Sequence, residues 1–168
     1  MESILVSRRS FLGRSSVATA GILIMPAFSP RQQQRREKPP ALRQELVKDF
    51  VVKGHGDLAG VKAMLDEEPG FLNACWDWGA GDFETALEGA GHVGNKEIAT
   101  YLISKGARMN IFVAAMLGQM EVVKAILTAF PDIIYSKGPH GLTFLHYARK
   151  GGEEAVPVLE YLKSLGAA

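Results

Sequence analysis

The chain has few of the residues on which several common kinds of functional site depend. Only one of its 168 residues, Cys75, is a cysteine, and aromatic residues make up only 8%. A single cysteine excludes an internal disulfide framework and a cysteine-rich zinc site. The longest mostly apolar run, residues 17–28, has 12 residues, fewer than the roughly 20 that a helix needs to cross a bilayer.

Hydrophobic residues, in contrast, are plentiful, and the charge is divided unevenly. Hydrophobic residues make up 47% of the chain, which is enough for the core of one compact domain. Eight of the nineteen basic residues but only two of the eighteen acidic ones lie in residues 1–43, so residues 44–168 carry a net charge of −5. An acidic body is a poor ligand for a polyanion, so we expect no nucleic-acid partner.

The N-terminal segment has the pattern of an export signal. A basic stretch precedes the apolar run and contains Ser7-Arg8-Arg9-Ser10-Phe11-Leu12-Gly13. It resembles the bacterial twin-arginine (Tat) signal, with Gly13 where that signal has lysine. The resemblance implies that Arg8, Arg9, Phe11 and Leu12 carry the signal, that the Tat translocase is a partner, and that the protein is periplasmic or otherwise exported.

The fate of the signal segment, residues 1–29, stays open. Small residues at Ala27 and Ser29 fit a cleavage site, but Pro30 would follow the cut. We therefore keep a second possibility, in which the uncleaved segment anchors the chain in the inner membrane facing the periplasm. Residues 30–41 are rich in proline, glutamine and arginine, and we expect them to form a flexible linker.

Residues 42–168 repeat one pattern about four times. Each copy has a short helical segment, a glycine turn and a second segment with an apolar stripe at helical spacing. The turn glycines are Gly56, Gly94, Gly118 and Gly152. Neither segment can bury its apolar face alone, so we expect neighbouring copies to stack.

This pattern resembles the ankyrin repeat. The best-matching copies contain Thr85, Leu87, Ala90, Gly94, Glu97, Ile98, Leu102, Gly106, Ala107 and Asn110, and then Gly141, Thr143, Leu145, His146, Ala148 and Gly152. The resemblance implies an all-α fold, a short solenoid of about four helix-turn-helix units over residues 42–168. The turn glycines are spaced 38, 24 and 34 residues apart, against a family period of about 33. The short step leaves no room for a β-turn finger before Ile111, and the long step holds an enlarged finger over residues 73–83.

Local spacing reveals no catalytic, cofactor or metal site. The four histidines have no metal-ligand spacing such as HxxxH, and no nucleophile signature surrounds Cys75, which we expect to be buried or in a turn. We expect His146 to bond the neighbouring backbone, as the ankyrin resemblance implies, and His55 and His92 to lie near carbonyls at the ends of first helices. We therefore expect no enzyme activity and no cofactor.

The remaining candidates are contact residues for a protein partner. Trp76, Trp78 and Phe83 lie in a predicted loop, and tryptophan is common at binding hot spots, although both tryptophans can equally well cover the core. The resemblance adds variable contact positions, giving the candidate set Trp76, Trp78, Asp82, Phe83, Glu84, His92, Met116, His140, Leu142 and Lys150. The expected function is an exported interaction module. The alternative is an accessory subunit or protective partner of a periplasmic enzyme, which can also carry a cofactor.

Overall fold

The computed structural model describes residues 38–167, and these residues are mostly helical. The predicted all-α class is confirmed at this level. The predicted signal residues Arg8, Arg9, Phe11 and Leu12 and most of the predicted linker lie outside the described residues. None of the described helices is both long and apolar enough to span a membrane.

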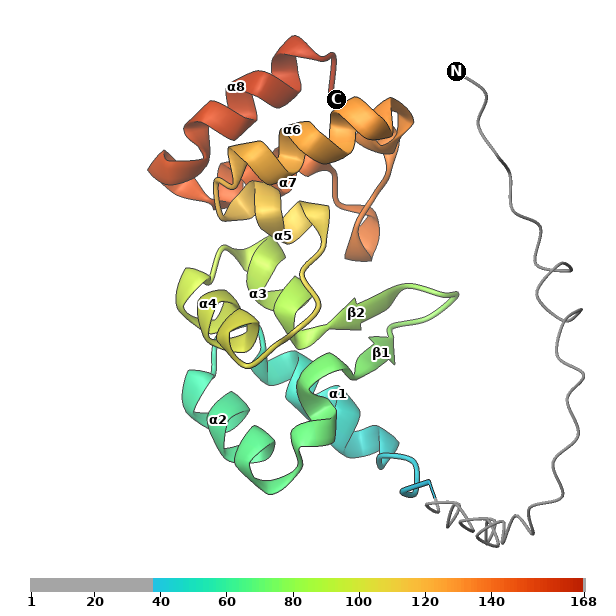
Figure 1. Cartoon of the computed structure of the whole chain (residues 1–168). Coiled ribbons are helices and arrows are strands. Elements are labelled where there is room, and N and C mark those ends of the chain that lie inside the picture. The colour runs from blue at the N-terminus through green and yellow to red at the C-terminus, as the bar shows by residue number, and fades with distance from the viewer. Residues whose placement is uncertain (1–37, 168) are drawn as a thin grey trace, which may run out of the picture. The chain divides into compact units, whose positions relative to one another are not determined.

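The described residues contain four pairs of α-helices (Figure 1). The pairs are α1 (Gln44–Lys53) with α2 (Leu58–Glu67), α3 (Ala86–Val93) with α4 (Lys96–Ser104), α5 (Ile111–Met116) with α6 (Met120–Ala129), and α7 (Phe144–Lys150) with α8 (Val156–Ser164). Short 3-10 helices η2 (Pro69–Asn73), η3 (Pro131–Tyr135), η4 (Pro139–Gly141) and η5 (Gly152–Ala155) lie between them.

Capping residues fix the points at which several of the helices begin and end. Thr85 and Glu88 form a reciprocal capping box at the start of α3, and Asn110 accepts a hydrogen bond from the backbone N–H of Val113 at the start of α5. Gly94 ends α3 with a φ of 84°, a left-handed conformation that glycine adopts without strain. Pro157 lies in the first turn of α8, where the missing backbone N–H costs no helical hydrogen bond.

The first helices of the pairs pack against one another. Helix α3 contacts α1 and α5, and α7 contacts both α5 and α3. The double contact of α7 is possible because α3 presents Gly91 on that side, where a Cβ atom would lie 3.0 Å from Val113 and 3.3 Å from Tyr147. In consequence the segments that precede α3 and α7 come together, and Asp82 contacts His140, 58 residues further along the chain.

The segment predicted as an enlarged finger is a β-hairpin. Strands β1 (Cys75–Asp77) and β2 (Phe83–Thr85) pair antiparallel, with Trp76 opposite Glu84. The carboxylate of Asp77 accepts hydrogen bonds from the backbone N–H groups of Gly79 and Gly81, which closes the turn. The predicted loop around the tryptophans is thus two short strands, and Cys75 is exposed on β1 rather than buried or in a turn.

The third pair has no such hairpin. Helix α5 begins at Ile111, directly after its N-cap Asn110, as the short repeat spacing predicts. The turn before α7 lies against the β1–β2 hairpin. His140 in that turn donates its backbone N–H to Asp82 of the hairpin over 2.8 Å. This hydrogen bond holds the two turns side by side.

Candidate functional site

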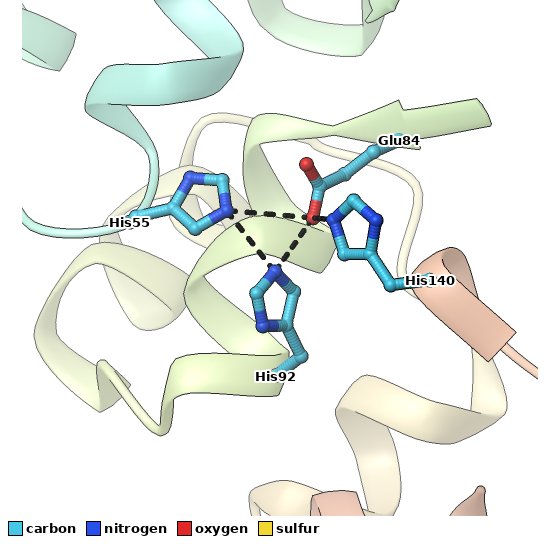
Figure 2. A group of neighbouring side chains, drawn as sticks. All are labelled: His55, Glu84, His92 and His140. Atoms are coloured by element: carbon cyan, nitrogen blue, oxygen red, sulfur yellow. Dashed lines mark hydrogen bonds and ion pairs between the residues drawn. The ribbon is translucent and has the colours of Figure 1, made fainter. Parts of the chain in front are cut away.

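Three histidines and one glutamate converge between the first helices and the hairpin (Figure 2). His55 follows the end of α1, Glu84 lies in β2, His92 lies in the last turn of α3, and His140 lies in η4. One ligand-type atom from each residue falls within 4.8 Å of the other three. We call these four residues the His–Glu cluster.

The carboxylate of Glu84 is the centre of the cluster. Its Oε1 lies 2.7 Å from Nε2 of His92 and 3.5 Å from Nε2 of both His55 and His140. Nε2 of His55 lies 3.0 Å from Nε2 of His92. Figure 2 shows all three rings pointing toward this carboxylate.

Neighbouring groups hold each ring and the carboxylate in place. Nδ1 of His55 donates to the backbone carbonyl of Val51 over 3.0 Å, as expected of a histidine at a helix end. Nδ1 of His140 lies 2.9 Å from a carboxylate oxygen of Asp82. The indole Nε1 of Trp78 donates to Oε2 of Glu84 over 2.7 Å. These contacts leave Oε1 and the Nε2 atoms facing one another.

His140 has an unusual backbone conformation that serves this arrangement. Its φ is 60°, in the left-handed region that residues with a side chain seldom adopt. The two hydrogen-bonding contacts with Asp82, one from the backbone and one from the ring, hold the turn in this state. Strain of this kind persists where surrounding contacts require it, and it is often found at functional sites.

The carboxylate of Glu84 is buried and charged. The side chain of Glu84 is fully buried, with 0% of its surface exposed. Burial alone would raise the pKa of Glu84, but contacts with His55, His92 and Trp78 outweigh it and lower the pKa to about 2. The same carboxylate raises the pKa of His55. The cluster therefore contains a charged, buried carboxylate surrounded by imidazoles.

The chemistry open to such a group is proton sharing or metal binding. Imidazole nitrogen and carboxylate oxygen are the ligands that zinc and related metals use in proteins. The rings of His55 and His140 also line a shallow pocket with Val52 and Trp78, so one side of the cluster is open to solvent.

The structure divides the predicted contact residues into three groups. The exposed members are Trp78, Phe83, His140 and Lys150, and the partly buried members are Trp76, Asp82, His92 and Leu142. Trp76 packs against the core, so the two tryptophans have different environments. Glu84 and Met116 are fully buried, so neither can touch a partner, and for these two the contact prediction is wrong. Met116 is buried because α5 lies between α3 and α7.

The His–Glu cluster leaves no spacing motif in the sequence because its residues come from separate segments of the chain. No two of them lie closer than eight residues apart in the sequence. One signal was available: His55 and His92 both lie at the ends of first helices, and stacking places equivalent repeat positions side by side. The position of His140 depends on the contact between α7 and α3, which the repeat pattern does not predict. His146, outside the cluster, bonds the carbonyl of His92 over 2.8 Å, the backbone role expected of it.

Comparison with known proteins adds no assignment. No model of a known protein family matches the chain, and no curated protein matches it significantly.

Proposed function

We propose that this chain is an exported, ankyrin-type protein-interaction module. The proposal rests on the packing of the four helix pairs with their first helices in contact, which agrees with the ankyrin-like sequence pattern. Modules of this type bind partners with the tips of their fingers and the neighbouring first helices. In this chain those elements are the β1–β2 hairpin, the turn at His140 and the exposed end of α1.

The hairpin offers the surface that such a contact needs. Phe83 is 57% exposed on β2, and Trp78 and Val52 are also exposed. Exposed aromatic side chains on a rigid hairpin have little conformational freedom to lose on binding, which favours affinity. Lys150, an exposed cation in the last turn of α7, lies against Gly94 at the end of α3.

Photo-crosslinking in the producing cells tests the contact surface. We expect a photoreactive phenylalanine analogue at Phe83 to give one discrete protein adduct, because this side chain projects from the hairpin. Tyr135 supplies the matched control, since it is 71% exposed but lies beside α6 and α8. Equal adducts from both positions, or none from Phe83, contradict the proposed surface.

The export half of the proposal depends on the paired arginines of the signal. We expect the double variant Arg8→Lys/Arg9→Lys to stay in the cytoplasm, because the Tat motif requires the arginine pair. Cell fractionation and immunoblotting measure the distribution. The control is Arg35→Lys/Arg36→Lys, the same change in the predicted linker, which should be exported normally. Arrival of the first variant in the periplasm would show that the segment is not a Tat signal.

A further inference from the structure

We propose that the His–Glu cluster binds one divalent transition-metal ion of the zinc class, through Nε2 of His55, His92 and His140 and Oε1 of Glu84. This site goes beyond the interaction module and does not depend on the identity of its partner. Five observations support it.

The spacing of the four atoms fits a shared ion. Zinc lies about 2.0–2.1 Å from nitrogen and oxygen ligands, so tetrahedral ligand atoms lie about 3.3 Å from one another. In the cluster, Oε1 of Glu84 lies 2.7 Å from one ring nitrogen and 3.5 Å from the other two. The two closest ring nitrogens are 3.0 Å apart. Small side-chain rotations bring such a set to metal-ligand geometry.

The protonation of the rings leaves lone pairs directed into the cluster. Nδ1 of His55 faces a backbone carbonyl, which only accepts, so the proton of a neutral ring is on Nδ1. Nδ1 of His140 faces the carboxylate of Asp82 in the same way. Nε2 of both rings is then an acceptor, 3.5 Å from the anionic Oε1 of Glu84. The free ring nitrogens and Oε1 are therefore directed toward one another, as the ligands of a shared metal ion are.

Oε1 of Glu84 is buried and accepts no hydrogen bond of regular geometry among the described residues. Its closest contact is Nε2 of His92 at 2.7 Å, and the same nitrogen also lies 3.0 Å from Nε2 of His55. A buried carboxylate oxygen needs well-directed partners, and a metal ion at this position would supply one. The other oxygen, Oε2, is held by Trp78 and is not available.

The surroundings have the organisation of a metal site. Histidine ligands usually donate their second N–H to a carbonyl or a carboxylate, which fixes the ring and strengthens the nitrogen as a ligand. His55 does so with Val51, and His140 with Asp82. The strained backbone of His140 is explained by the same need, because it aims the ring at Glu84.

The ligand set also indicates the class of ion. Three imidazoles and one carboxylate suit zinc and its neighbours in the first transition row, whereas magnesium and calcium require mostly oxygen ligands. Partial exposure of His55 and His140 gives the ion a route from solvent. Because the ligands come from three of the four helix pairs, binding should also stabilise the packing of those pairs.

Calorimetric titration of the untagged, EDTA-treated chain with zinc chloride tests the proposal. We expect one ion per chain and a rise in melting temperature on zinc addition, with magnesium giving neither. Glu84→Gln should weaken zinc binding by more than the roughly 10–100-fold that loss of an outer-shell partner costs, because it removes the only anionic ligand. Asp77→Asn is the matched control: it removes one carboxylate charge from the same hairpin but keeps the oxygen that closes the turn. It should bind zinc like the parent chain.

A second variant covers the possibility that Glu84→Gln fails to fold. His140→Gly removes one ligand from an exposed turn and keeps the left-handed backbone, which glycine favours. Its circular dichroism should match that of the parent chain while its zinc affinity falls to a similar extent. The cobalt-substituted parent should show the intense visible absorption of a four-coordinate ion, and the variant should not. Absence of stoichiometric zinc binding by the parent, or unchanged affinity in His140→Gly, overturns the proposal.

Discussion

Phe144→Ala should lower the free energy of unfolding by about 3–5 kcal/mol. Phe144 begins α7, is only 1% exposed, and stacks on Phe112 of α5 with ring centroids 4.2 Å apart. Phe112 also contacts the ring of Tyr147, so three aromatic rings share this part of the core. Alanine would leave a cavity at the contact between α5 and α7, and the cost of such a cavity depends on how far the neighbouring side chains can move into it.

Chemical denaturation followed by circular dichroism measures this loss. The matched control is Phe130→Ala, because Phe130 is 62% exposed at the end of α6. A surface substitution of this kind should change the free energy by no more than about 0.5 kcal/mol. If the two variants lose equal stability, then α7 does not pack on α5 as described.

The helices themselves follow from local sequence, and this is why they could be predicted. The caps at Thr85 and Asn110 and the turn at Gly94 depend on residues three or four positions away. The start of α8 near Pro157 follows from the geometry of a single residue. Such short-range rules need no knowledge of the rest of the chain.

The repeat spacing locates the enlarged finger at residues 73–83 but does not predict that it forms two strands. Its two strands have three residues each and enclose Gly79 and Gly81. Strands this short carry almost no alternating pattern, so nothing in the local sequence distinguishes them from a loop. The pairing between Trp76 and Glu84, and with it the burial of Glu84, depends on packing of the hairpin against α1.

The His–Glu cluster could not be predicted because it depends on long-range packing. Its residues belong to the first, second and fourth pairs, and they meet because α7 packs on α3 at Gly91. The same glutamate that the repeat pattern assigns to a contact surface is thereby enclosed by three imidazoles. A repeat pattern predicts only the contacts that every unit makes with the next one. This site depends on the contact between α7 and α3, which are not in neighbouring units.

Gly54→Ala should lower the free energy of unfolding by about 3 kcal/mol, although it adds only one methyl group. Gly54 ends α1 directly against the first residue of α3. A Cβ atom at Gly54 would lie 2.5 Å from the backbone oxygen of Ala86 and 2.6 Å from its Cα. Backbone atoms cannot rotate away as a side chain does, so the two helices must separate.

Gly56→Ala provides the control two residues further along the chain. A Cβ atom there would meet nothing within 4 Å, so its stability should be unchanged or rise slightly, since alanine restricts the unfolded chain. Both substitutions flank His55, but only Gly54→Ala moves the end of α1 away from α3, and with it the ring of His55 away from His92. Denaturation curves of the two variants therefore test the contact that holds the first pair on the second. Equal stability of the two would show that α1 is free to shift, and that His55 is not held in the cluster by the packing of α1.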